Sequence, residues 1–180
     1  MNHDLTHLGD PHLKLAAFKL WVHGYQYPDC DDYWDGNWLR ATAICSENGA
    51  TVQISGAFIR NTEIADWHLA VEKIGINLAG EARLECMEPD LAVGLKFQPL
   101  GAVEMTVEIS PDHLSQEHRF VFLIDQSYLA RCHRNASDCC KNFQYGALDD
   151  QPVTSWLMAS SWNENRLHHL VHFILGVFDF

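Results

Sequence analysis

Positively charged residues are scarce in this chain. Its 180 residues include 12 Lys and Arg against 24 Asp and Glu, which gives a formal net charge of −12. Residues 1–130 hold 8 basic and 19 acidic residues, so −11 of this charge lies there. Proteins bind nucleic acids and anionic lipids by neutralising phosphates with Lys and Arg. The composition therefore argues against nucleic acid and membrane as direct ligands and predicts a basic protein partner.

The sequence also lacks a long hydrophobic run and a secretory leader. The most apolar stretch, Leu167–Phe180, is too short to span a bilayer and is interrupted by His and Gly. The first ten residues contain neither a basic nor an apolar leader segment. We therefore expect a cytoplasmic protein whose six cysteines are reduced thiols rather than a disulfide framework.

No complete motif for catalysis or cofactor binding is present. The chain contains no G-x-S-x-G nucleophile elbow, no Walker A sequence and no G-x-G-x-x-G phosphate-binding loop. Ser, His and Asp are abundant, but abundance without spacing does not define a catalytic site. The sequence therefore predicts a protein that is not an enzyme and that needs no cofactor.

Two groups of potential metal ligands have incomplete spacings. Asp29, Asp31, Asp32 and Asp35 suggest a calcium loop, but an EF-hand that starts at Asp31 has Thr42 where a bidentate Glu is required. A second group lacks both the C-x-x-C knuckle and the His-Glu-x-x-His pattern of zinc sites: Cys132, His133, Cys139, Cys140, His168 and His172. We therefore predict no bound metal, with the acidic stretch forming a solvated loop.

Alternating apolar residues predict a mainly antiparallel sheet. Three strands are expected before the first helix: Leu13–Val22, Asn37–Cys45 and Thr51–Phe58. Four more are expected after it: Ala82–Met87, Leu91–Phe97, Ala102–Ile109 and Arg119–Ile124. Glu47-Asn-Gly49 is a hairpin turn, because Asn-Gly tolerates the positive φ angles of a type I′ turn. The sequence thus predicts an α+β fold with one curved sheet of about seven strands.

One inserted helix and C-terminal helices complete the predicted fold. Residues Asn61–Ile76 place apolar side chains at helical spacing, so one stripe faces the core. This helix follows the third strand, with Asn61 or Thr62 as the expected cap. Asp125–Leu129 begins a helical turn, and Trp156–Phe178 supplies a final amphipathic helix.

Four large aromatics lie where the first predicted hairpin meets this helix. They are Trp34, Trp38, Phe58 and Trp67. Because aromatic side chains dominate the burial of apolar area in protein cores, we expect at least three of them to share one core cluster.

The most distinctive segment is the predicted loop Tyr25–Leu39, which packs five aromatics and four aspartates into fifteen residues. Tyr and Trp offer large contact areas with polar tips, and carboxylates steer a cationic ligand. We therefore predict a partner-binding surface formed by Tyr27, Asp29, Asp31, Asp32, Tyr33 and Asp35. The competing interpretation is a small metal- or ligand-dependent enzyme that uses this loop as its pocket.

This loop resembles the WapI-type immunity proteins of bacterial contact-dependent toxin systems, in which an aromatic-Trp-Asp-Gly-Asn-Trp-Leu run follows a first strand. Four segments match the family pattern in order and spacing over residues 12–130. They are Tyr33-Trp-Asp-Gly-Asn-Trp-Leu39, the Gly56–Phe58 strand end before the helix with Trp67, Met87-Glu-Pro-Asp-Leu91 and Asp125-Gln-Ser-Tyr-Leu129. We therefore expect a sheet domain over residues 1–130, with residues 131–180 as a helical extension packed on it.

The resemblance implies a cytoplasmic immunity protein that binds and blocks a cognate toxin domain. The resemblance also implies that this toxin is a nuclease. The charge agrees, because domains that cleave RNA or DNA need basic active-site surfaces, which an acidic inhibitor complements. The expected protein is a non-enzymatic monomer or homodimer.

Overall fold

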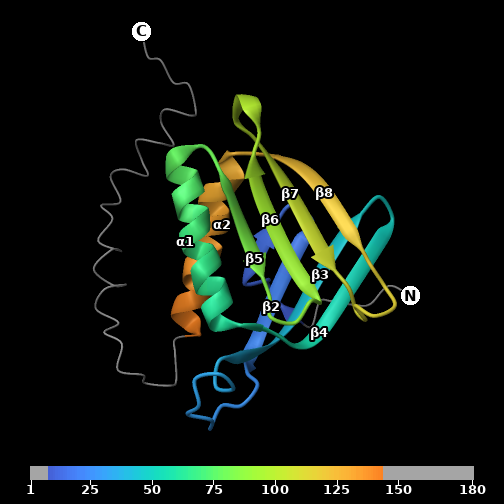
Figure 1. Cartoon of the computed structure of the whole chain (residues 1–180), viewed down its shortest axis with the longest axis vertical. Coiled ribbons are helices and arrows are strands. Elements are labelled where there is room, and N and C mark those ends of the chain that lie inside the picture. The colour runs from blue at the N-terminus through green and yellow to red at the C-terminus, as the bar shows by residue number, and fades with distance from the viewer. Residues whose placement is uncertain (1–7, 144–180) are drawn as a thin grey trace. The chain divides into compact units, whose positions relative to one another are not determined.

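Two four-stranded antiparallel sheets form the framework of the structure, a computed structural model that describes residues 8–143 (Figure 1). The first sheet contains, in spatial order, β1 (Leu13–Leu15), β2 (Phe18–Tyr25), β3 (Trp38–Glu47) and β4 (Ala50–Arg60). The second contains β5 (Glu81–Glu85), β6 (Leu91–Phe97), β7 (Ala102–Ile109) and β8 (Arg119–Asp125). Helix α1 (Asn61–Asn77) follows β4, the 3-10 turn η2 (Pro99–Gly101) joins β6 to β7, and helix α2 (Ser127–Asn142) follows β8.

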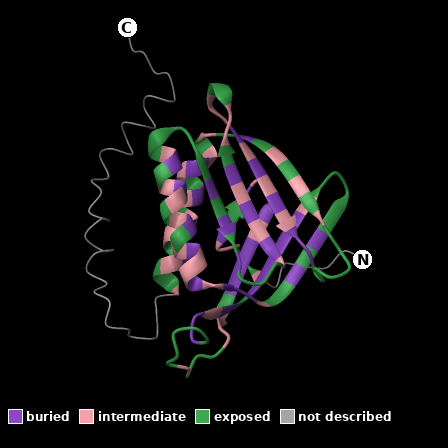
Figure 2. Cartoon of the chain, viewed as in Figure 1, coloured by how far each residue is buried: buried purple, intermediate pink, exposed green. Residues whose placement is uncertain are grey.

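One hydrophobic core unites the two sheets and the two helices (Figure 2). Strand β7 shows how the sequence creates it, because Val103, Met105, Val107 and Ile109 are buried while the residues between them are partly exposed. Successive side chains of a strand point to opposite faces, so this alternation gives each sheet one apolar face. Removing these faces from water is the main favourable contribution to folding.

The β3–β4 hairpin and helix α1 confirm two predictions. Asn48 and Gly49 have φ angles of 48° and 86°, as a type I′ turn requires. Helix α1 buries the apolar stripe Ile64, Trp67, Val71 and Ile74. Its N-cap residue is Arg60, however, so the prediction that Asn61 or Thr62 caps the helix is wrong.

The prediction of one curved sheet with about seven strands is also wrong. The expected strand Leu13–Val22 is divided in two, because Ala16 has a φ of 49° and turns the chain between β1 and β2. A left-handed conformation is uncommon for a non-glycine residue, so the sequence gives no signal for this turn. The inserted helix consequently follows the fourth strand, and the strands after it form a second sheet. Alternation identifies strands but does not reveal how many sheets they form.

The prediction that at least three of the four aromatics share the core is wrong as well. Phe58 and Trp67 are buried in the core, whereas Trp34 is 61% exposed. Trp38 is half-buried and lies outside the core. Because β3 directs Leu39 into the core, the residue before it points to the opposite face.

The start of α2 agrees with the helical turn predicted after the last strand. The Asp125 carboxylate accepts a hydrogen bond of 2.8 Å from the backbone N–H of Ser127, at the first turn of α2. Within residues 8–143, no helix is long and apolar enough to cross a membrane. The predicted helix Trp156–Phe178 lies outside the described residues, and the division into domains 1–130 and 131–180 stays a prediction.

Helices α1 and α2 contact each other through a pair of histidines. The ring centroids of His68 and His133 are 4.4 Å apart, and His133 Nε2 lies 4.0 Å from Glu72 Oε1. Burial, followed by the charge of His133, lowers the pKa of His68 to about 4. Burial also lowers the pKa of His133, although the Glu72 carboxylate acts in the opposite direction; Arg134 and Lys141 lower it further. The two imidazole rings therefore pack as neutral groups at neutral pH.

Acid should weaken this helix pair. The unfolded chain protonates His68 near its usual pKa of 6.5, whereas the folded protein resists protonation down to about 4. The free energy of unfolding is therefore unaffected by His68 at pH values above 6.5, the pKa of this group in the unfolded chain. It falls as the pH drops from there toward about 4, the pKa of His68 in the folded protein. Urea denaturation at a series of pH values between about 7 and 5 should show this loss, and His68→Phe, which keeps a ring in place, should reduce it. An identical pH dependence in both proteins would contradict the assignment.

Candidate partner-binding surface

The loop of residues 26–37 joins β2 to β3 at the end of the first sheet where α1 begins (Figure 1). All six side chains predicted to bind a partner are exposed on it: Tyr27, Asp29, Asp31, Asp32, Tyr33 and Asp35. Trp34, which the sequence placed with the core candidates, is the most exposed aromatic of the loop at 61%. The loop thus presents acidic and aromatic side chains together.

Asp32 shapes the centre of this loop through its own side chain. Its Oδ1 accepts hydrogen bonds from the backbone N–H groups of Trp34 at 2.8 Å and Asp35 at 3.1 Å. Its backbone carbonyl accepts a third, of 2.8 Å, from Gly36. This Asx turn satisfies backbone donors that neither sheet reaches, so the loop has a defined conformation.

Gly36 is required by a close approach of two backbone segments. A Cβ atom at this position would lie 2.6 Å from the carbonyl oxygen of Asp32 and 2.8 Å from that of Cys30. Both atoms belong to the main chain, so no side-chain rotation can relieve the clash. The glycine of the Trp-Asp-Gly-Asn-Trp run therefore lets the loop fold back on itself.

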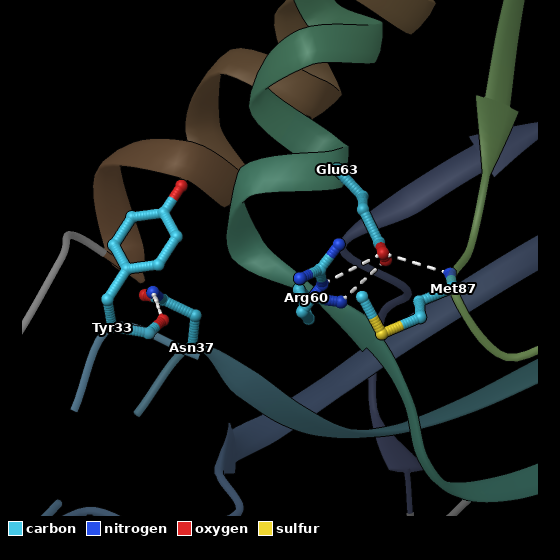
Figure 3. Close-up of polar contacts among 5 residues, drawn as sticks. All are labelled: Tyr33, Asn37, Arg60, Glu63 and Met87. Carbon is cyan, nitrogen blue, oxygen red and sulfur yellow. Dashed lines mark hydrogen bonds and ion pairs between the residues drawn. The ribbon is translucent and has the colours of Figure 1, made fainter. Parts of the chain in front are cut away.

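Asn37 ties the loop to the start of α1. Its side-chain Nδ2 donates a hydrogen bond to the backbone carbonyl of Tyr33 (Figure 3). Its own backbone carbonyl accepts a hydrogen bond of 3.1 Å from the N–H of Asn61, the first residue of the helix. Asn37 is only 1% exposed, so it is a structural part of the loop rather than a contact residue.

The Glu63 carboxylate connects the same helix start to the turn between β5 and β6 (Figure 3). It accepts hydrogen bonds from the Arg60 backbone N–H at 2.9 Å, from Arg60 Nε at 3.0 Å and from the Met87 backbone N–H at 3.0 Å. The Glu63 side chain is 9% exposed and that of Arg60 15%, so the ion pair is largely removed from water. Such a pair offsets the cost of burial only when hydrogen bonds satisfy its groups, and here the carboxylate accepts three, one of them from the guanidinium.

The guanidinium of Arg60 also positions two tryptophans. Its Cζ lies 5.9 Å from the ring centroid of Trp34 and 5.7 Å from that of Trp38, within the range of cation–π attraction. Trp38 belongs to the start of β3, whereas Trp34 lies in the loop. The exposed Trp34 is therefore held against the framework from one side and remains open to a partner on the other.

Sequence reasoning found the loop but missed the residues that support it. Arg60 and Glu63 are three residues apart at the start of α1, and only the fold brings Met87, from the turn before β6, to them. Glu63 had one available signal, because a Glu three residues after an N-cap is the spacing of a capping box. No comparable signal identifies Arg60, since the N-cap position rarely holds Arg.

The predicted metal candidates have other surroundings in the structure. Cys132 and Cys139 are buried in the core, and burial raises the pKa of each thiol to about 12. His133 stacks on a second imidazole instead of joining them. Between residues 8 and 143, no group of three His, Cys, Asp or Glu side chains is placed to hold a metal ion. His168 and His172 lie outside the described residues.

Gly36→Ala should destabilise the protein by roughly 2 kcal/mol or more, because backbone must move to admit the methyl group. Gly75→Ala is the matched control, since the added Cβ at this helical position meets nothing within 4 Å. At this position, in the last turn of α1, the change should be neutral or stabilising by up to about 1 kcal/mol. Urea denaturation measures both values, and similar stabilities for the two variants would refute the close-approach argument.

Glu63→Ala should cost about 2–3 kcal/mol of unfolding free energy, because it leaves the largely buried Arg60 guanidinium and the Met87 amide without their acceptor. Asp66→Ala, at an exposed position of the same helix, should change the stability by less than about 0.5 kcal/mol. Thermal and urea unfolding of the two variants test this difference, and a loss below about 0.5 kcal/mol for Glu63→Ala would show that the carboxylate does not join these segments.

Comparison with known protein families gives a match that spans most of the chain. The model of the immunity protein WapI-like family matches residues 11–144, which covers all strands and helices described above. Neither the comparison with curated proteins nor that with solved structures yields a match.

Proposed function

Because this chain belongs to the WapI-like immunity protein family, we propose that it neutralises a cognate toxin domain by binding it with the loop of residues 26–37. Membership of the family implies toxin neutralisation, which immunity proteins typically achieve by binding rather than by catalysis. The observation that supports this loop is its combination of exposed acids and exposed aromatics on a defined backbone. It contributes four aspartates and no basic residue.

We propose that the toxin domain is a nuclease. An enzyme that cleaves RNA or DNA needs a basic surface to hold its substrate. The net charge of −12, with the loop aspartates at an exposed end of the first sheet, complements such a surface and accelerates encounter by long-range attraction. The complex would form in the cytoplasm, where the substrates of the nuclease are.

Exposed aromatics of the same loop would retain the toxin after encounter. Tyr27 is 50% exposed and Tyr33 is 42% exposed. Trp34, with the support of Arg60 beneath it, adds the largest apolar surface of the three. Large rigid aromatics at the centre of an interface contribute most of its binding energy, while charges at the rim mainly affect the association rate.

The defined backbone of the loop adds to its affinity. The Asx turn of Asp32 and the hydrogen bonds of Asn37 fix the loop before a partner arrives. Binding therefore spends little free energy on ordering the surface. The alternative enzyme, with residues 25–39 as a pocket, lacks equivalent support because the loop acids are exposed to solvent.

A kinetic binding series tests this proposal against the toxin domain encoded by the neighbouring gene. Replacing Asp29, Asp31 and Asp35 with Asn should lower the association rate and flatten its dependence on salt, because exposed charges act over about a Debye length of 8–10 Å. Asp32→Asn belongs in a separate variant, since this side chain also orders the loop. Trp34→Ala, Tyr27→Ala or Tyr33→Ala should instead speed dissociation. For a hot-spot residue, the loss of binding free energy should be about 2 kcal/mol.

The matched control replaces Glu47, Glu81 and Glu117 with Gln. These three exposed acids lie outside the loop, on β3, β5 and the segment before β8, and their replacement changes the net charge by the same amount as the aspartate variant. A smaller effect of the control on the association rate would support local steering by the loop. The interface would lie elsewhere if two results occurred together: the two triple variants lower the association rate equally, and the aromatic variants leave the dissociation rate unchanged. Absence of any binding or protection would refute the immunity function for this chain.

A further inference from the structure

Strand β8 forms an open edge of the second sheet. The order of this sheet is β5-β6-β7-β8, so β8 pairs with β7 on one side only (Figure 1). No other strand among residues 8–143 pairs with its second side. An edge strand leaves a row of backbone N–H and C=O groups available for another strand, and proteins usually blunt such edges with charges, prolines or bulges.

The edge of β8 shows none of the usual protection at its centre. Its pairing with β7 is regular, without a bulge, from Ala102↔Asp125 to Glu108↔Arg119. Two apolar side chains point away from the core at the middle of the strand, where Val121 is 53% exposed and Leu123 is 74% exposed. Charged residues are confined to the ends, with Arg119 at the start and Asp125 at the end.

Strand β4, one of the two edge strands of the first sheet, differs from β8 in its solvent-facing side chains and in the regularity of its pairing. Strand β4 directs Thr51, Gln53 and Ser55 outward, so its solvent face is polar. Its pairing with β3 contains a register shift between Leu39 and Arg40, which is a bulge or irregularity. Bulges and polar side chains discourage edge-to-edge pairing. The contrast indicates that β8, rather than β4, is the edge suited to a partner strand.

We propose that β8 pairs with β8 of a second copy of this chain, antiparallel and centred on Phe122, to join two four-stranded sheets into one of eight strands. In this register, Arg119 of each copy lies opposite Asp125 of the other, and Val121 lies opposite Leu123. An antiparallel register places directly opposed residues on the same face, so both ion pairs and both apolar pairs form on the outer face. The strand is therefore complementary to itself in charge and in the positions of its apolar side chains.

The inner face of the strand supports the same register. Phe120 and Phe122 are only half-buried against the core, because β8 is the last strand of its sheet. Pairing about Phe122 would place the two Phe122 side chains opposite each other and Phe120 opposite Ile124 of the other copy. A two-fold axis through Phe122 makes this interface isologous and closed, so it yields a dimer rather than a fibre.

This self-association is independent of the toxin-binding proposal. It uses the edge of the second sheet, whereas the loop of residues 26–37 belongs to the first sheet and the start of α1. Failure of one proposal therefore does not affect the other, because the dimer test needs no toxin and the toxin-binding variants leave β8 unchanged.

The first experiment measures the mass of the full chain by sedimentation equilibrium up to about 100 μM, a range that detects dimers of micromolar affinity. We expect a reversible species of twice the chain mass of 20.5 kDa. Leu123→Lys should weaken dimerisation at least tenfold, because it places a charge at the centre of the paired strands. Ile76→Lys is the control, since Ile76 is also an exposed aliphatic residue, at 53% against 74% for Leu123, but lies on α1.

A charge exchange tests the register itself. Arg119→Asp places two carboxylates opposite each other at both ends of the interface and should weaken the dimer about tenfold. The double variant Arg119→Asp with Asp125→Arg restores opposite charges and should recover most of the loss. Both residues also have contacts within one copy, because Arg119 Nε lies 3.9 Å from Glu108 Oε1 on β7 and Asp125 accepts a hydrogen bond from Ser127. Circular dichroism and urea denaturation must therefore first show that each variant keeps its fold.

Three outcomes would overturn the proposal. The first is a full chain that remains monomeric at about 100 μM, which would show that β8 does not pair with a second copy at micromolar affinity. The second is that Leu123→Lys and Ile76→Lys weaken the dimer equally, as judged from the mass measured by sedimentation equilibrium. The third is a folded double variant that dimerises no better than Arg119→Asp alone, which would exclude the register centred on Phe122.

Discussion

The largely buried carboxylate of Glu63 joins two parts of the structure that are separate in sequence. It accepts hydrogen bonds from the backbone and side chain of Arg60, at the junction of β4 and α1, and from the backbone of Met87, before β6. An isolated charge at a position with 9% exposure would cost several kcal/mol, so these donors are a condition for the local fold. Because Arg60 in turn lies against Trp34 and Trp38, the same carboxylate orients the base of the exposed loop.

The exposed loop shows how a polar segment becomes a defined surface without secondary structure of its own. Asp32, Gly36 and Asn37 each solve a backbone problem: a turn, a close approach and a link to the helix. Since these structural functions fall on a few residues, the remaining acids and aromatics can point into solvent. A rigid surface of this kind suits fast, charge-steered binding followed by retention through aromatic contacts.

The edge of the second sheet has a different character from this loop. Its exposed centre is aliphatic and its ends carry opposite charges, which favours pairing with an identical strand over a highly basic partner. A dimer formed through β8 would carry two copies of the loop, so self-association and toxin binding would depend on separate sets of residues. This separation lets each surface be altered while the other stays intact.

Local features of the sequence determined the helix of α1, most of the strands, the Asn-Gly hairpin and the acidic, aromatic loop. Each depends on residues within a few positions of one another: a periodicity of apolar side chains, a turn with positive φ or a concentration of charge. The family was likewise visible in the Trp-Asp-Gly-Asn-Trp run and the segments that follow it. Only the tertiary structure decided that Ala16 turns the chain, that the strands form two sheets and that Trp34 is exposed. It also decided that Arg60, Glu63 and Met87 meet beneath the loop, because contacts between distant segments follow from how whole sheets and helices pack, and no short stretch of sequence encodes that packing.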